Sequence, residues 1–284
     1  MTIMRARPAV SMDRLSRLGR RAPDAAGAGG RTPWRWAIAG AVLGAALATA
    51  VWAPARWLAA GLHAASGGKV QLVNPRGTFW QGSAGLVLAS GTQGGEAVAL
   101  PGRVGWQLRA RWLGLSGRLD LPCCAQAPVG FALRRAGAGM QLAWQDAATR
   151  WPATLLTGLG APWNTLKPEG TLTLHTRGLV LGFEPERLAI TGQATLDATD
   201  MSSSLSTLRP MGSYRLDLAG GQAPSLLLTT REGALQLAGS GLWSGRAMRF
   251  SGEATAAAGS EDALSNLLNI IGRREGARSI INLS

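Results

Sequence analysis

The longest uninterrupted apolar segment of the chain lies near its N-terminus. Residues 36–53 carry no charge, and Trp34 and Arg35 stand directly in front of them. Together they make a segment of about 20 residues, which is enough to cross a hydrocarbon core about 30 Å thick. Tryptophans stand near both ends, where indole rings favour the membrane interface. The pattern predicts a transmembrane helix over residues 34–53.

The segment is better explained as an anchor than as a cleaved signal peptide. The apolar core of a signal peptide is shorter and begins nearer the terminus, whereas 33 residues precede residue 34 here, and Pro54 would impede cleavage. Eight arginines precede the charge-free run, while only Arg56 and Lys69 follow it closely. The positive-inside rule then places the N-terminus in the cytoplasm. We therefore expect a single-pass protein of a bacterial inner membrane, with a disordered basic cytoplasmic tail over residues 1–33 and a β-rich periplasmic domain over residues 54–284.

Beyond the anchor, apolar and polar residues alternate with a period of two. Leu172 and Leu174 share one side of their segment, and Tyr214, Leu216 and Leu218 share one side of theirs. This period indicates strands of an antiparallel sheet with one apolar face and one wet face. The apolar face needs a cover, which is another sheet, a helix, lipid or a partner chain.

A glycine-bounded pattern occurs three times along the predicted sheet. Residues 77–88 match residues 170–181, and residues 233–243 match both more loosely, with glycines eight positions apart and a strand expected on either side of the second glycine. We interpret this as internal duplication of a β unit, with chance recurrence in a Gly- and Leu-rich chain as the alternative. The predicted fold class is mainly β: one N-terminal transmembrane helix, then a repeated, twisted antiparallel sheet with one or two short helices.

Two segments have helical patterns. Residues 152–159 begin with a proline and stop at Gly160, as a short helix does. Residues 260–272 have Ser260 as the expected N-cap, acidic residues in the first turn and a leucine-rich stripe. Residues 279–283 fit a final strand.

The net charge of +13 raises the question of nucleic-acid binding. Residues 1–53 contribute +6 and the remaining +7 is spread over residues 54–284, with no concentrated patch and no DNA- or RNA-binding signature. The charge pattern therefore argues against nucleic acid as a partner.

The sequence offers no legible active site. Its two histidines, His63 and His175, are far apart, and residues 66–70 resemble a phosphate-binding loop only superficially because the required glycine spacing and the Ser/Thr after Lys69 are missing. We predict no catalytic residues, no metal site, no cofactor and no enzymatic activity. The adjacent Cys123 and Cys124 leave three states open in an oxidising compartment: a strained vicinal bridge, two free thiols, or a bridge to a partner.

Several fragments of the exported region carry a resemblance to a known family. The chain resembles the type II secretion system protein N family (GspN) from about Trp52 to its C-terminus. The fragments, in order, are Ala55-Arg-Trp-Leu58, Gly77-Thr-Phe-Trp-Gln-Gly82, Leu159-Gly-Ala-Pro-Trp-Asn-Thr-Leu166, Met211-Gly-Ser-Tyr-Arg-Leu-Asp-Leu218 and Leu267-Leu-Asn-Ile-Ile-Gly-Arg-Arg274. The long basic tail departs from the family's usual short one.

The resemblance implies an accessory inner-membrane component of a machine that exports folded proteins through an outer-membrane secretin. Its implied partners are the secretin and inner-membrane subunits of that system. Exposed strand edges and the arginines at 273, 274 and 278 are candidate contacts, although these arginines equally fit capping of the preceding helix. Two hypotheses from other classes remain: a lipid-handling periplasmic β-groove protein, and an envelope hydrolase, which the missing nucleophile–base pair disfavours.

Overall fold

The computed structural model describes residues 34–90, 97–184, 187–243 and 247–283, so the predicted tail over residues 1–33 lies outside the described residues. The chain divides into two compact units, Met1–Ala48 and Thr49–Ser284. Within the described part, the first unit consists of most of helix α1 (Trp34–Val51), whose residues are all exposed. This helix is long and apolar enough to span a membrane by length and composition.

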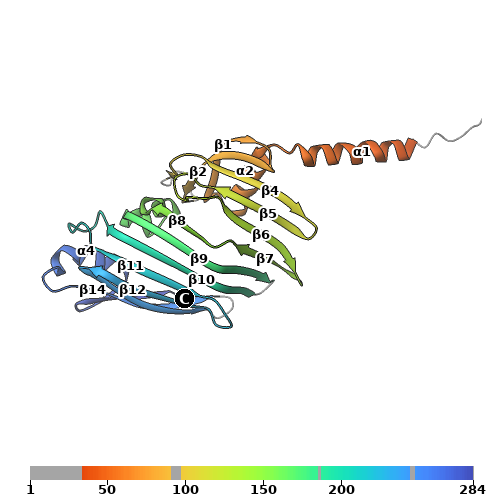
Figure 1. The fold of residues 1–284 in the computed structure, drawn as a ribbon. Helices are drawn as coiled ribbons and strands as arrows, with labels where there is room; N and C mark the ends of the chain where they lie inside the picture. The colour runs from red at the N-terminus through yellow and green to blue at the C-terminus, as the bar shows by residue number, and fades with distance from the viewer. Residues whose placement is uncertain (1–33, 91–96, 185–186, 244–246, 284) are drawn as a thin grey trace, which may run out of the picture. The chain divides into compact units, whose positions relative to one another are not determined.

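The second unit is built mainly from strands (Figure 1). Its helices are α2 (Ala55–Ala65), η2 (Ala153–Leu159), α3 (Trp163–Leu166) and α4 (Glu261–Ile271). Its strands are β1 (Val70–Gly77), β2 (Gln81–Ala89), β3 (Ala97–Ala99), β4 (Val104–Arg111), β5 (Gly114–Asp120), β6 (Val129–Ala136), β7 (Gly139–Trp144), β8 (Ala147–Pro152), β9 (Glu169–Glu184), β10 (Arg187–Ser202), β11 (Gly212–Ala219), β12 (Ser225–Gly233), β13 (Leu235–Trp243), β14 (Met248–Ala256), β15 (Arg273–Glu275) and β16 (Arg278–Leu283).

All described strands belong to one open antiparallel sheet. The order is β1-β2-β4-β5-β6-β7-β9-β10-β11-β12-β13-β14-β16-β15, with β3 paired to β2 and β8 paired to β9. Neighbours in the sheet are therefore almost always neighbours in the chain, and β1 and β15 form its two edges. The mainly β, antiparallel fold predicted from the sequence is confirmed.

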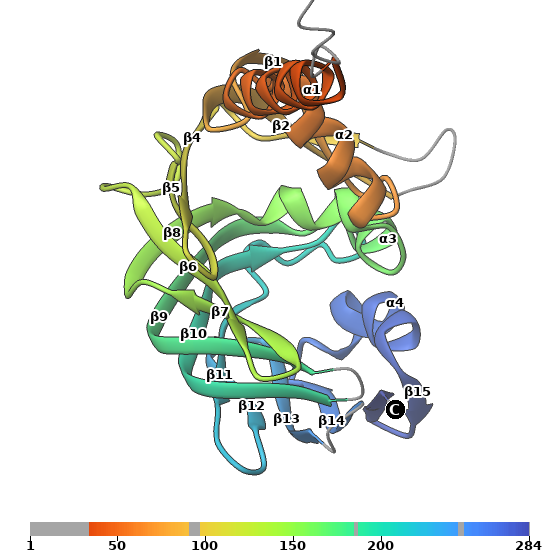
Figure 2. The same cartoon turned by 90° about the vertical axis from the view of Figure 1, so that its right-hand side faces the viewer.

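The inner face of the sheet carries Trp106, Leu172 and Leu235 and packs against helices. The outer face carries the alternate residues of each strand. Figure 2 shows that the sheet curves and that α2, α3 and α4 lie on its concave side. The predicted alternation explains the arrangement, because residues two apart along a strand share a face. The sequence left four covers open for the apolar face: another sheet, a helix, lipid or a partner chain. The structure shows helices on this face.

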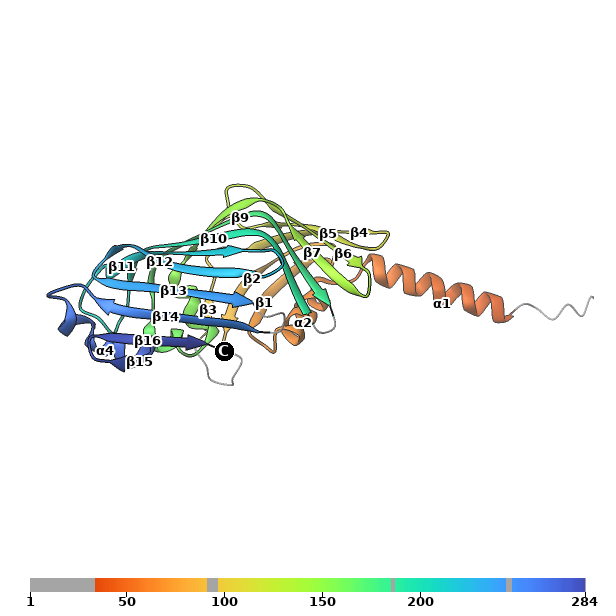
Figure 3. The same cartoon turned by 90° about the horizontal axis from the view of Figure 1, so that it is seen from below.

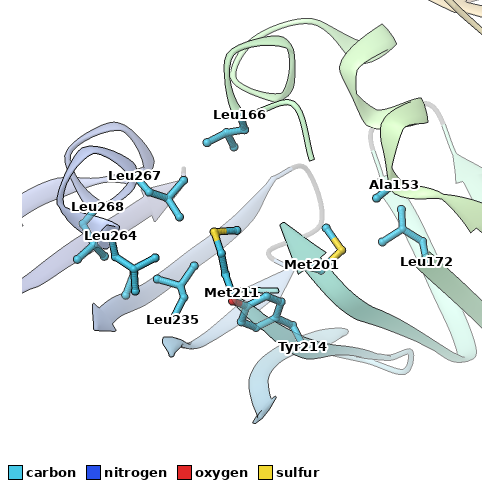
Figure 4. Close-up of a cluster of buried hydrophobic side chains, with 11 residues drawn as sticks. Ala153, Leu166, Leu172, Met201, Met211, Tyr214, Leu235, Leu264, Leu267 and Leu268 are labelled. Carbon is cyan, nitrogen blue, oxygen red and sulfur yellow. The ribbon is translucent and has the colours of Figure 1, made fainter. Parts of the chain in front are cut away.

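The largest buried cluster lies between α4 and the C-terminal half of the inner face (Figure 4). Leu264, Leu267 and Leu268 are at most 2 % exposed and are directed toward side chains that include Leu235 and Tyr214. The leucines recur at helical spacing on one side of α4, so one face of the helix covers the sheet. Burial of this apolar area stabilises α4, whose 11 residues would be marginal as an isolated helix.

Two further clusters lie in the N-terminal half. Leu155 of η2 packs with Val104, Leu121 and Val129, and Ala55 of α2 packs with Trp106 and other residues of β2 and β4. The Trp106 indole Nε1 donates to the Phe79 carbonyl at 3.0 Å. Helices therefore cover the inner face in three places.

The local predictions are correct in place but not always in detail. Residues 153–159 form a 3₁₀ helix that ends at Gly160, and α4 ends at Gly272 as expected. Ser260 stands at the N-cap of α4, but its side chain makes no capping hydrogen bond. Helices α2 and α3 exceed the one or two predicted.

One expectation about the three-fold pattern is wrong. The second glycine of each copy does not separate two strands: Gly85, Gly178 and Gly241 lie inside β2, β9 and β13. The first glycines, Gly77 and Gly233, have positive φ at the ends of β1 and β12, where the chain turns. Internal duplication stays a prediction.

Candidate interaction surfaces

The two histidines do not meet in the structure. His63 lies exposed on α2, and His175 lies exposed on the outer face of β9, opposite Thr195 of β10. Residues 66–70 form the turn from α2 into β1, where the Ser66 hydroxyl accepts a hydrogen bond from the Val70 amide at 3.0 Å. Among the described residues, no group of three His, Cys, Asp or Glu side chains is placed to hold a metal ion.

Cys123 and Cys124 form a vicinal disulfide, which selects the first of the three states left open by the sequence. The bridge lies in the connection between β5 and β6, and Cys124 is buried against Leu121 and Leu155. It therefore forms part of the wall of a buried cluster.

The C-terminal arginines lie after α4 rather than on its last turn. Arg273 pairs with Glu275, Arg274 donates to the Gly276 carbonyl at 2.7 Å, and Arg278 lies 3.8 Å from Glu253. These contacts stay within β14, β15 and β16 and their turn, at one edge of the sheet. Capping of α4 by these side chains is not observed among the described contacts.

Two acidic residues on the outer face of the C-terminal half, Asp197 and Asp217, have partners on the neighbouring strand. Arg215 of β11 donates from Nε and Nη2 to the two carboxylate oxygens of Asp197 on β10, at 2.7 and 3.0 Å. The guanidinium holds the pKa of the Asp197 carboxyl below its usual range, mainly through this hydrogen bond. Asp217 accepts from the Thr195 hydroxyl at 2.7 Å. The charge of Asp197 is therefore compensated by Arg215.

The outer face of β4 to β7 is different. A hollow of about 530 Å³ lies there, with Arg109, Arg111 and Arg118 among its lining residues and small side chains such as Ala132 and Ala143 in the same set. No acidic residue lines it. Within the described part of the chain, these three guanidinium groups have no ion-pair partner. The hollow is therefore suited to an anionic group.

Exposed apolar side chains lie at the turns and strand ends next to this hollow, and those of Met140 and Phe183 belong to the inner face, opposite to it. Trp112 and Leu113 form the turn between β4 and β5 and are 96 % and 62 % exposed. In the neighbouring hairpin, Arg135 pairs in register with Met140, and Met140 pairs with Phe183 of β9. Met140 and Phe183 are exposed as well.

We call this surface the basic rim. It comprises Arg109, Arg111, Trp112, Leu113, Arg134, Arg135, Met140 and Phe183. Sequence reasoning missed it, because no single fragment contains it. The available signal was the segment Arg109-Ala-Arg-Trp-Leu113, in which arginines flank an apolar pair at the point where two alternating strands meet.

The part of the chain that forms the sheet matches a known protein family. The family model described as "Type II secretion system (T2SS), protein N" matches residues 68–281. No curated protein matches the chain, and no solved structure does either. The matched range begins just before β1 and ends in β16, so it covers the sheet and α4 but neither α1 nor α2. The chain belongs to the type II secretion system protein N family.

Proposed function

We propose that this protein is an accessory inner-membrane component of the type II secretion system and takes part in export across the outer membrane by binding other subunits. The observation that carries this proposal is the family match over residues 68–281. The fold supports a binding role, because it offers two open sheet edges and an uncompensated basic surface. The proposal includes no catalytic step.

The anchored topology is part of the same proposal. Helix α1 meets the length and hydropathy of a membrane span, and the eight arginines that precede residue 36 favour a cytoplasmic N-terminus. Alkaline phosphatase, which is active only outside the cytoplasm, fused after Ser284 should be active, whereas the same reporter fused before Met1 of the full chain should be inactive. The reverse pattern would overturn the orientation.

Partner binding is tested by crosslinking in cells. A photoreactive residue at Val73 on the edge strand β1, or at Arg274 on the edge strand β15, is expected to capture the secretin or an inner-membrane secretion subunit. Leu227, exposed on the central strand β12, is the matched control position. A purified complex from gently solubilised membranes that lacks the secretin and every inner-membrane subunit would contradict the proposal.

A second candidate function is lipid handling on the inner face. Leu133, Leu142 and Leu181 pair in register across β6, β7 and β9. They stay partly exposed and lie outside the three buried clusters. A photoreactive residue at Leu181 should form acyl-chain adducts that the same residue at Val180, on the outer face, does not form. Equal yields at the two positions would remove this candidate.

A further inference from the structure

The β4–β5 turn carries a tryptophan whose indole is almost entirely exposed to solvent. Trp112 is 96 % exposed, and Leu113 beside it is also exposed. The Leu113 carbonyl accepts a hydrogen bond from the Arg135 amide at 2.9 Å, so the turn is tied to the β6–β7 hairpin. A contiguous exposed apolar patch rimmed by polar residues marks an interaction site. Two-residue turns normally contain Gly, Asn or Asp, so turn geometry does not account for these residues.

The patch extends across three hairpins at one end of the sheet. Met140 and Phe183 are register partners, and Arg135 opposite Met140 is held to the Leu113 carbonyl. Figure 3 shows the β4–β5 and β6–β7 turns and the adjoining ends of β9 and β10 at the same end of the strands. Trp112 and Leu113 therefore lie at the tip of this end of the sheet, and Met140 and Phe183 lie near them on its inner face.

Positive charge lies mainly on the outer face of the same end, next to the turn residues Trp112 and Leu113. Arg111 and Arg134 both flank Gly114 in register on the outer face, and Arg109 lies two residues from Arg111 on the same strand. In the described part of the chain, the side chains of these arginines and of Arg135 have no ion-pair or hydrogen-bond partner. The described acid at this end is Glu184. At the opposite ends of the strands, Glu232, Glu261 and Asp262 lie exposed.

Residues 49–53, which end the predicted apolar segment, contact the turn between β1 and β2. Residues 49–53 belong to the same compact unit as the strands. The Ala50 carbonyl accepts from Trp80 Nε1 at 2.8 Å, and the Ala53 carbonyl accepts from the Phe79 amide at 2.7 Å. The Leu108 amide in turn donates to the Trp80 carbonyl at 2.6 Å. From Leu108 to Trp112 is four residues, or about 13 Å along an extended strand.

We propose that the basic rim binds the anionic surface of the bilayer that the apolar segment spans. This contact holds the second compact unit, Thr49–Ser284, against the membrane. Trp112 and Leu113 enter the headgroup layer, where indole rings are favoured, and the arginines contact lipid phosphates. The short path from residue 50 to the turn keeps the rim near the point where the segment leaves the membrane. This inference depends on the proposed anchor but not on any secretion partner, so the two proposals can fail separately.

The test uses the full chain in vesicles and a photoreactive amino acid, benzoylphenylalanine, in place of Trp112. The matched control replaces Ala258, which is exposed in the connection between β14 and α4 at the other end of the sheet. In vesicles of phosphatidylglycerol and phosphatidylcholine, lipid adducts at position 112 are expected to exceed those at position 258 by about tenfold. Equal adduct yields at the two positions would overturn the proposal, and so would adducts at position 112 that contain protein but no lipid.

A second arm tests the charge. The double variant Arg111→Gln and Arg134→Gln should lower the yield at position 112 by about tenfold in phosphatidylglycerol-containing vesicles, and have little effect in phosphatidylcholine alone. Both residues are exposed, so the variant should keep the melting temperature of the parent. An unchanged yield in the folded double variant would exclude the electrostatic contribution and contradict the proposal.

Discussion

Leucines of the inner face are buried at one end of the sheet and partly exposed at the other. At the end where α4, η2 and α3 lie, leucines of the inner face such as Leu172 and Leu235 are at most 7 % exposed. At the hairpin end, Leu133 and Leu142 of the same inner face stay partly exposed, and Trp112 is exposed almost completely. The strands have the same period-two pattern at both ends. The pattern thus determines which face a side chain occupies, but not whether that face is covered.

The connections account for the difference. The β4–β5 and β6–β7 turns at the hairpin end contain two residues each. At the other end, long connections follow β8, β10 and β14, and two of them contain η2, α3 and α4. A two-residue turn has no length from which to build a helical cover.

The largest effect is expected from Leu268→Ala in α4. Leu268 is fully buried, so truncation leaves a cavity and should lower the free energy of unfolding by about 2–5 kcal/mol. Leu242→Ala is the matched control, because Leu242 is 62 % exposed, and its effect should stay within about 0.5 kcal/mol. Urea unfolding of the full chain in detergent measures both. Similar losses in the two variants would mean that the ends are equally packed.

Gly114→Ala tests what holds the hairpin end together. A Cβ at this position would lie 2.0 Å from the Leu133 carbonyl oxygen and 2.8 Å from the Arg134 Cα, so β5 and β6 would have to separate. We expect a loss of about 1–3 kcal/mol in the same unfolding experiment. In contrast, Gly61→Ala in α2 meets open space and should stabilise the helix by about 0.5–1 kcal/mol. A neutral Gly114→Ala would show that strand contact there is loose.

Asp197→Asn tests the compensated charge on the outer face, with an effect smaller than the two above. The pKa of Asp197 is lowered in the folded protein by Arg215, so its contribution to stability is present above the unfolded pKa and is lost as pH falls through the folded pKa. The melting temperature of the variant should therefore fall below that of the parent at about pH 7 and approach it at about pH 3. A gap that is equal at both pH values would contradict the assigned ion pair.

Tyr214→Phe should have an effect close to zero or slightly stabilising. Burial raises the pKa of Tyr214 and keeps its hydroxyl neutral. Among the described residues, that hydroxyl has no hydrogen-bond partner. Its removal should therefore change the free energy of unfolding by less than about 1 kcal/mol, in the stabilising direction if at all. A clear loss of stability would reveal a bound water or ligand at the covered end.

The sequence was sufficient for the strand pattern and for the helix over residues 260–272, because both depend on local periodicity. Residues 171–175 and 214–218 form strands as predicted. Helix α2 was missed because its alanine- and leucine-rich segment follows directly on the apolar run and offers no separate start signal.

The basic rim was unpredictable for a different reason. Trp112, Arg135 and Phe183 come together only through the register of β5, β6, β7 and β9, and a sequence read locally does not give register. The sequence also did not predict which face the helices cover, because the length of a connection does not determine which side of the sheet it crosses.

The near-sequential strand order also bears on how the protein is made. Apart from a few short excursions, each strand pairs with the one that left the ribosome just before it. Contacts of this kind close short loops, which lowers the entropic barrier to each pairing and favours fast formation. The topology lets the sheet grow by one strand at a time from β1, in the manner of a repeat array that extends from one end. Only α4 must wait, because the strands it covers have to be in place before its leucines find a surface.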